Sequence, residues 1–262
     1  MMLTLHSWHT STFDTHRWAG LQQSVATCLR CEPHELGVLH KIEAARGNRP
    51  RKSRRRMTGR NADPELLKAL CITYHEFVCQ HIAPQIAEAF TSTGSQATAI
   101  AFQANPSLRV NTPAARPAGR RHRDRDYGHQ PAQVNYWLPL SPAFGSNTLH
   151  VEGICAAGGP EVATPLEGGF GTLHRFNGNE LYHFTRPNDS DCTRVSLDFR
   201  VVPGQLYDND HPASRSSTNG RQAFFVGGYY AWAELGEDGG WTVRDDGAGV
   251  VRGNAALKLA PQ

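Results

Sequence analysis

The sequence has no long hydrophobic run, little net charge and no recognisable leader segment. No stretch approaches the roughly 18 apolar residues that a membrane-spanning helix needs. The amino-terminal MMLTLHSWHT lacks a basic stretch followed by an apolar one, so we expect no secretory signal and a cytoplasmic protein with reduced thiols. A net charge of +3 over 262 residues gives no reason to expect a nucleic-acid or membrane partner, and we expect neither.

Internal repeats and an interdomain linker are also lacking, so we expect one domain over residues 1–262. The 25 Gly and 16 Pro favour turns and strands over a helical bundle. From Ala97 onward, short β-type runs alternate with turn residues, which is typical of a sandwich or jelly roll. The expected layout is helical support and a basic loop over 1–96, a β core over 97–235 and a C-terminal tail over 236–262.

The amino-terminal part is predicted to be helical after an irregular lead-in over residues 1–12. Apolar residues at helical spacing predict one helix from Phe13 to Arg30. Asp63 suits an N-cap and Pro64 suits the first helical position, so a second helix is expected to begin there. It should end near Phe90, with Pro84 kinking it or starting another helix.

Two further motifs in this part leave alternatives open. The segment Gly47–Arg60 contains seven Lys or Arg and no acid. It could contact phosphates, form a solvated mobile loop, or act as a lid that brings cations to an acidic substrate, and we favour the loop. Cys28 and Cys31 form C-x-x-C with His34 nearby, but a second close pair is lacking, so ordinary thiols are favoured over a zinc site.

A His and a carboxylate two residues apart carry the main chemical signal. His122 and Asp124 would point to the same face of an extended strand and could both reach one metal ion. The third ligand would be a later histidine; His183 is the preferred candidate, in competition with His174 and His129. Two His and one carboxylate make the facial triad of non-haem Fe(II) oxygenases.

A basic strand follows the third candidate ligand. Arg194 and Ser196 lie on one strand face, where a guanidinium fork and a hydroxyl could hold a carboxylate at two points. A 2-oxo acid that chelates iron through its C1 end needs its far carboxylate held in this way. The alternative for Arg194 is a surface ion pair with Asp191 or Asp198, and Arg200 is the second candidate for the anchor.

Taken together, three motifs resemble the Fe(II)/2-oxoglutarate-dependent dioxygenases. They are HRDRDYGHQPAQVNYWLPL, RFNGNELYHFTRPND and TRVSLDFRVVP. Within that family they look like the phytanoyl-CoA-dioxygenase-like enzymes related to a dioxygenase of streptomycin biosynthesis. The resemblance covers roughly Leu108 to Tyr230 and implies a double-stranded β-helix, cupin-like, with the preceding helices as outer support.

The resemblance also implies roles for individual residues. It implies Fe(II) binding by His122, Asp124 and His183, and 2-oxoglutarate binding by Arg194 with Ser196 and, through the C1 carboxylate, Asn135. In similar proteins an acidic residue tends to stand in place of Gln133, which weakens any inference about the substrate. The implied activity is oxidation of an unactivated C–H bond with O2, releasing succinate and CO2.

The reaction and substrate are less specified than the cofactors. Hydroxylation is the usual outcome, with desaturation or cyclisation possible, whereas the carboxylate at Asp124 argues against halogenation. A small polar metabolite or natural-product intermediate is the expected substrate, with possible contacts from Arg109, Tyr127, His129 and Tyr230. Two other functions compete: a cupin-like metal enzyme that uses no 2-oxoglutarate, and a basic protein that binds nucleic acid through Gly47–Arg60.

Overall fold

A long strand, β9, lies at the centre of the larger of two antiparallel sheets. The computed structural model describes residues 7–47, 63–91, 96–114, 119–153, 162–212 and 224–244. In the larger sheet the strand order is β1-β7-β4-β9-β2-β10-β11, and β3 also pairs with β9. These strands are β1 (His9–Thr12), β2 (Ala99–Gln103), β3 (Ser107–Asn111), β4 (Val134–Pro139), β7 (Thr172–Phe176), β9 (Arg194–Pro203), β10 (Tyr230–Leu235) and β11 (Trp241–Val243).

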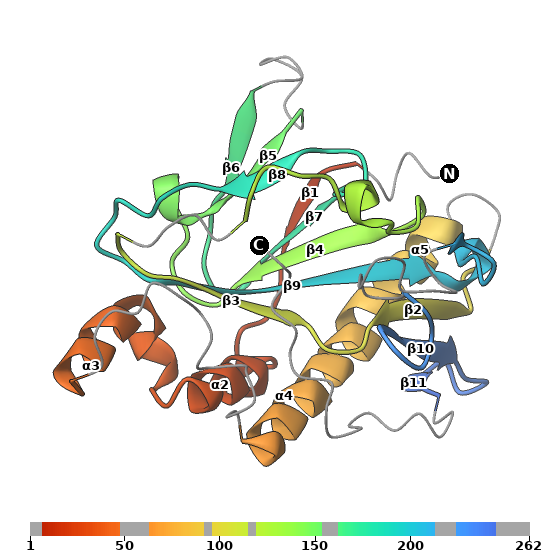
Figure 1. The fold of residues 1–262 in the computed structure, drawn as a ribbon. Coiled ribbons are helices and arrows are strands. Elements are labelled where there is room, and N and C mark those ends of the chain that lie inside the picture. The colour runs from red at the N-terminus through yellow and green to blue at the C-terminus, as the bar shows by residue number, and fades with distance from the viewer. Residues whose placement is uncertain are drawn as a thin grey trace.

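The smaller sheet lies across from the larger one (Figure 1). Its order is β6-β5-β8, with strands β5 (Leu149–Glu152), β6 (Ala163–Leu166) and β8 (His183–Thr185). A backbone bridge joins His122 to His183 at the edge of β8. The chain thus passes repeatedly between two facing antiparallel sheets, which is the jelly-roll arrangement. The prediction of a mainly β chain with N-terminal helices and a double-stranded β-helix core is confirmed.

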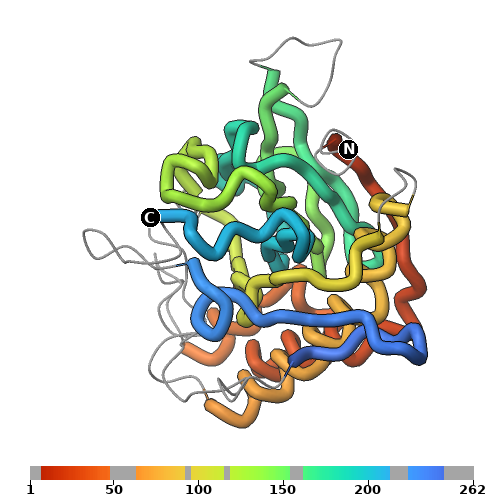
Figure 2. The backbone as a smooth tube through the Cα atoms, turned by 90° about the vertical axis from the view of Figure 1, so that its right-hand side faces the viewer, coloured from red at the N-terminus to blue at the C-terminus, as the bar shows by residue number. Residues whose placement is uncertain are grey.

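Helices cover the other side of the larger sheet, as Figures 1 and 2 show from two directions. The α-helices are α2 (Ala19–Cys28), α3 (Leu39–Ala45), α4 (Pro64–Phe77) and α5 (Ala83–Thr91). A π turn over Val78–Ile82 joins α4 to α5, and short 3-10 turns occupy Pro33–Val38, Asp124–Tyr127, Gly145–Asn147 and Gly204–Leu206. As predicted, the Asp63 side chain caps α4 by accepting from the Glu65 amide at 3.0 Å, with Pro64 in the first turn.

Side chains of β9 alternate between two environments. Val195, Leu197, Phe199 and Val201 belong to the hydrophobic core shared with the helices. There the Phe199 ring stacks on Tyr136 with centroids 5.3 Å apart. Because successive residues of a strand point to opposite faces, the intervening residues face the smaller sheet. Those residues are polar and buried or nearly so: Arg194, Ser196, Asp198 and Arg200.

Several predicted boundaries are wrong. Residues 9–12, expected to be irregular, pair with β7, because backbone pairing does not need the apolar alternation that the sequence lacks there. Residues 121–124 make one bridge and a 3-10 turn instead of a strand. The last long strand begins at Tyr230, where a run over 223–230 was predicted. The helix expected from Phe13 begins at Ala19.

The C-terminal boundary of the β core also needs correction. The predicted tail over 236–262 contains β11, whose Trp241 and Val243 pair with Leu235 and Ala233 of β10. The β core therefore extends past residue 235, where the prediction ended it. Of the predicted basic segment, residues 48–60 lie outside the described residues. Within the described part of the chain, no helix has the length and apolar character needed to cross a membrane.

Candidate metal centre

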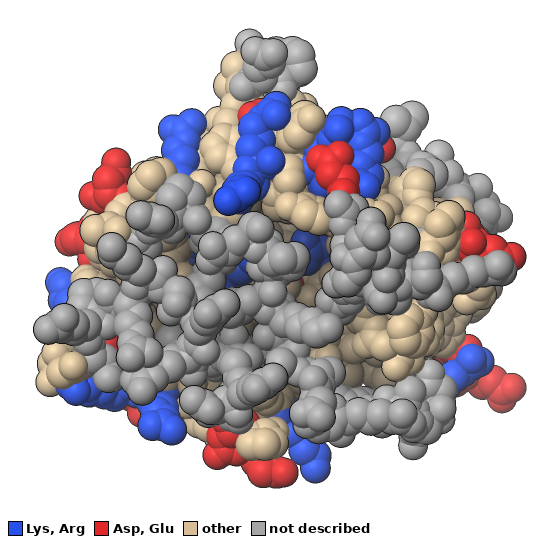
Figure 3. Space-filling model, in the orientation of Figure 1, with Lys and Arg blue, Asp and Glu red and all other residues tan. Residues whose placement is uncertain are grey.

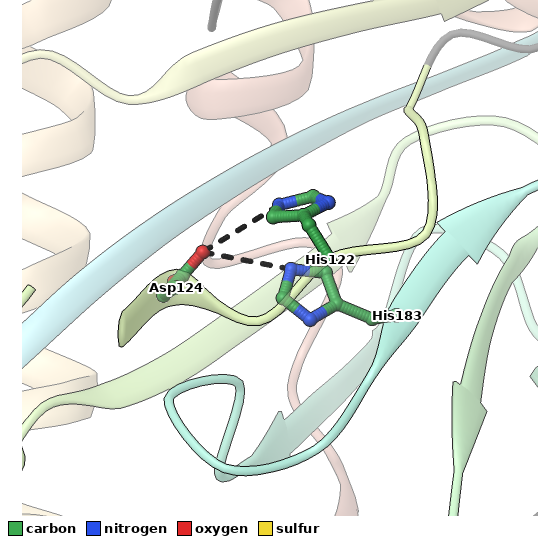
Figure 4. A group of neighbouring side chains, drawn as sticks. All are labelled: His122, Asp124 and His183. Carbon is green, nitrogen blue, oxygen red and sulfur yellow. Dashed lines mark ion pairs between the residues drawn. The ribbon is translucent and has the colours of Figure 1, made fainter. Parts of the chain in front are cut away.

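His122, Asp124 and His183 come together between the two sheets (Figure 4). Arg123 has extended backbone angles (φ −114°, ψ 148°), so the side chains on either side of it point the same way although no regular strand forms. The third residue opens β8, and its backbone exchanges hydrogen bonds with His122 at 3.3 and 3.0 Å. One ligand atom from each side chain lies within 4.8 Å of the others.

Backbone carbonyls fix the orientation of both imidazoles. Nδ1 of His122 lies 2.6 Å from the Arg120 oxygen, and Nδ1 of His183 lies 3.1 Å from the Leu181 oxygen. A neutral ring that donates from Nδ1 presents the lone pair of Nε2. Those Nε2 atoms lie 3.7 and 3.6 Å from Oδ1 of Asp124. Two nitrogens and one oxygen therefore converge as a facial set of metal ligands requires, and the donor set fits a divalent first-row ion.

The other oxygen of Asp124 is held by three donors. Oδ2 accepts hydrogen bonds from Gln133 Nε2 at 2.7 Å, Asn135 Nδ2 at 2.7 Å and Arg200 Nε at 3.0 Å. Oδ1 is thereby left on the side of the histidines. Asn135 was expected to contact a cosubstrate carboxylate, but its amide is engaged with Asp124 and, through its oxygen, with Gln133.

Charge and burial keep these groups in the states that metal binding requires. Burial alone would raise the pKa of Asp124, but the nearby Arg200 guanidinium, together with His129 and His183, holds that pKa well below its usual value. Burial lowers the pKa of His183 to about 4, against a smaller opposing effect of Asp124. At neutral pH the site therefore offers a carboxylate and a neutral imidazole.

The two competing histidines do not join this group. His174 lies on β7, where its Nδ1 is 3.0 Å from Thr10 Oγ1 and its Nε2 is 3.0 Å from the Glu167 oxygen. His129 is buried nearby, with its ring 3.8 Å from the Phe224 ring centroid. Among the described residues, His122, Asp124 and His183 form the one group with metal-binding geometry; Cys28 and Cys31 are not part of one.

The burial of His129 predicts that the folded protein loses stability in acid. Burial lowers the pKa of its imidazole to about 4 from 6.5, so the folded protein holds it neutral while the unfolded chain takes up a proton between these values. Its contribution, about 3 kcal/mol at neutral pH, should be lost as the pH falls from 6.5 to 4. Urea unfolding at a series of pH values should show a shallower decline for His129→Gln. An unchanged slope would contradict this assignment.

Arg194 is a buried residue of β9. It is 1% exposed, so the alternative of a surface ion pair does not apply. Its Nε donates to the Asn147 carbonyl at 3.1 Å, and its Nη1 donates to Ser196 Oγ at 2.9 Å. Arg200, the second candidate anchor, is engaged elsewhere, because it donates to both Asp124 and Asp198.

The residues expected near a substrate lie around the same interior. Arg109 pairs with Asp198 at 2.6 Å, and the Tyr127 ring lies 5.1 Å from that of His122. The Tyr230 hydroxyl donates to Gln133 at 3.2 Å. Sequence reasoning missed the contacts that Gln133, Asp198 and Arg200 make. The alternation of polar residues in QVN and SLDFR was a signal that these side chains share the inner face.

Charges on the outer face near the centre are paired. Arg121 forms an ion pair with Glu152 at 2.6 Å and Arg125 one with Glu180 at 2.5 Å. On the face drawn in Figure 3, blue and red side chains lie next to each other outside the grey residues.

One curated protein is similar to part of the chain. The streptomycin biosynthesis protein StrG of Streptomyces griseus is 34% identical over 137 residues, which is 52% of this chain. The match spans 62% of that protein, less than two thirds of its length. No known protein-family model matches the sequence.

Solved structures give weaker likenesses. The apo form of the non-haem monooxygenase ThoJ is 14% identical with a TM-score of 0.48, over 86% of this chain and 85% of that one. AviO1 from Streptomyces viridochromogenes Tue57 is 15% identical with a TM-score of 0.47, over 78% and 92%. The non-haem α-ketoglutarate-dependent epimerase SnoN from nogalamycin biosynthesis is 12% identical with a TM-score of 0.46, over 86% and 92%.

Proposed function

We propose that this chain is an Fe(II)- and 2-oxoglutarate-dependent oxygenase of the phytanoyl-CoA-dioxygenase-like group. The observation that carries the proposal is the convergence of two oriented imidazole Nε2 atoms on one oxygen of a buried carboxylate. His122, Asp124 and His183 would hold the metal and leave one side of it open. Bound iron would supply the activation of O2 that oxidation of an unactivated C–H bond requires.

The protein's own residues would bind, orient and shield the reactants. Arg194, with Ser196 beside it, would hold the far carboxylate of 2-oxoglutarate by a charge-assisted hydrogen bond. Both lie on the inner face of β9, the face that also carries Arg200 near the metal ligands. Asn135 would act on Asp124 and not on the cosubstrate.

The substrate is proposed to be a small polar metabolite or natural-product intermediate. The similarity to a protein of streptomycin biosynthesis supports natural-product chemistry. Hydroxylation is the proposed reaction, with desaturation or cyclisation as variants. Asp124 occupies the carboxylate position, which argues against halogenation. We propose one oxygenase domain over 1–262 that acts without a nucleic-acid or membrane partner.

An anaerobic titration tests the cofactor requirement directly. Purified apoprotein would receive Fe(II) and then 2-oxoglutarate while the visible absorption is recorded. The expected result is a metal-to-ligand charge-transfer band that needs both additions, followed by succinate release when oxygen is admitted. Succinate and 2-oxo acids without a second carboxylate serve as control ligands; the former should give no band, and the latter should need far higher concentrations.

Two other outcomes of this titration would support different functions. Tight metal binding without a band would contradict the use of 2-oxoglutarate and support the cupin-like metal enzyme. No metal binding at all would contradict the site itself and direct attention to the basic segment and nucleic acid.

A further inference from the structure

A row of alternating charges runs from the metal-site carboxylate into the larger sheet. Arg200 Nε donates to Asp124 at 3.0 Å, and Arg200 Nη1 donates to Asp198 at 2.8 Å. Asp198 in turn accepts from Arg109 Nε at 2.6 Å. We call these four residues, Asp124, Arg200, Asp198 and Arg109, the charge row. It places two positive and two negative side chains in alternation.

The charge row is shielded from water. The Asp124 side chain is 1% exposed and that of Arg200 is 8% exposed, while Asp198 and Arg109 are 17% and 15% exposed. Charges interact more strongly in such surroundings than on a wet surface. The stability of each buried carboxylate therefore depends on its neighbouring guanidinium. A substitution at one residue of the charge row changes the electrostatic environment of the next.

The metal and Arg200 would share one carboxylate from different directions. The histidine nitrogens lie near Oδ1 of Asp124, whereas the shorter Arg200 contact is to Oδ2, with Nη2 3.4 Å from Oδ1. Arg200 thus compensates a buried anion whether or not a metal is bound. A divalent ion at the histidines would then face a carboxylate whose charge is already partly balanced, which weakens its attraction.

We propose that Arg200 is a positioning residue that serves as the counter-ion of Asp124 in the metal-free protein and thereby lowers the affinity of the site for divalent metal. Asp198 moderates this effect, because it draws on the same guanidinium. This inference rests on the proposed function, since it takes His122, Asp124 and His183 as the ligands. If Arg200 acts in this way, loss of charge at Arg200 and loss of charge at Asp198 should shift the metal affinity of the site in opposite directions. Loss of packing alone would not produce opposite shifts.

Mn(II) binding to the purified protein tests this, with the free ion measured by its EPR signal. Arg200→Gln removes the positive charge and keeps an amide donor, while Gln133 and Asn135 still hold Asp124. We expect it to bind Mn(II) more tightly, on the order of 10-fold. Asp198→Asn leaves Arg200 without an anionic neighbour on that side, and we expect binding weaker by on the order of 10-fold.

Two control variants isolate the charge. Arg200→Lys keeps the positive charge and should bind Mn(II) like the wild type. Asp238→Asn makes the same acid-to-amide change as Asp198→Asn in an exposed turn and should have no effect. Metal-free Arg200→Gln should also melt at a lower temperature and gain more from Mn(II) than the wild type does, because its buried carboxylate has lost a partner.

The outcomes separate this inference from the proposed function. Arg200→Gln that binds Mn(II) equally or more weakly would show that Arg200 only orients the ligand, and the inference would be wrong. If that variant does not fold, Asp198→Asn decides: binding equal to or tighter than the wild type overturns the inference. A wild-type protein that binds no Mn(II) would instead contradict the metal site on which both rest.

Discussion

His183→Ala is expected to weaken Fe(II) binding by on the order of 100-fold or more and to abolish the charge-transfer band and turnover. Even residues that only orient a ligand cost 10- to 100-fold in metal affinity, and this change removes a ligand outright. The measurement is an anaerobic Fe(II) titration of the folded variant, checked by circular dichroism. Asp124→Asn should behave in the same way, because an amide oxygen lacks the charge that a divalent ion needs.

His174→Ala is the matched control for this experiment. It makes the same substitution at a buried histidine of the β-rich part, but both of its ring nitrogens already face protein partners, Thr10 and the Glu167 carbonyl. We expect it to lose some thermal stability and to bind Fe(II) normally. Normal binding by His183→Ala together with weak binding by His174→Ala would reverse the assignment of the third ligand.

Arg194→Ala is expected to leave Fe(II) binding intact and to raise the 2-oxoglutarate concentration that gives the half-maximal band by on the order of 100-fold. Removing one partner from a buried, hydrogen-bonded charge pair costs about 2–5 kcal/mol, a range that includes a change of this size. The variant should separate metal from cosubstrate binding, because the guanidinium donates to Asn147 and Ser196, which are not among the proposed metal ligands. The readout is the band at fixed Fe(II).

Two variants sharpen the Arg194 result. Arg194→Lys keeps the charge but not the planar fork, so its affinity should lie between those of the wild type and the alanine variant. Arg186→Ala makes the same change at an exposed position and should leave the titration unaltered. A wild-type curve for folded Arg194→Ala would refute the anchor and leave the position of the far carboxylate to another residue.

The candidate site could be predicted from the sequence because the two-residue spacing of its first two side chains determines their local geometry. His122 and Asp124 share a face whether or not a full strand forms, since one extended residue between them is enough. The alternation in β9 likewise placed Arg194 and Ser196 together. The basic strand that follows His183 at a useful distance, with Arg194 and Ser196 on one face, then favoured His183 over His174. The contacts of Gln133 and Arg200 with Asp124 depend on which strands pair, and no local pattern encodes that pairing.

Fold class was predictable for similar reasons, whereas element boundaries were not. Turn residues and short apolar runs predict many strands, and the Asp63-Pro64 pair predicts where α4 begins. The strand at His9–Thr12 is mostly exposed and held by backbone hydrogen bonds to β7, which leaves no hydrophobic period to read. The extension of the sheet to β11 has the same cause, because Trp241–Val243 is too short to show a period.

The two faces of β9 also constrain how a protein of this kind can diverge. One face packs against the helices through Val195, Leu197 and Phe199, and the other carries two members of the charge row, Asp198 and Arg200, and the proposed anchor. A one-residue insertion or deletion within the strand would exchange the two faces, driving guanidinium and carboxylate groups into the hydrocarbon interior. Evolution along β9 is therefore confined to substitution, and changes in chain length should accumulate in the connections between strands, where new substrates can be accommodated without resetting the register.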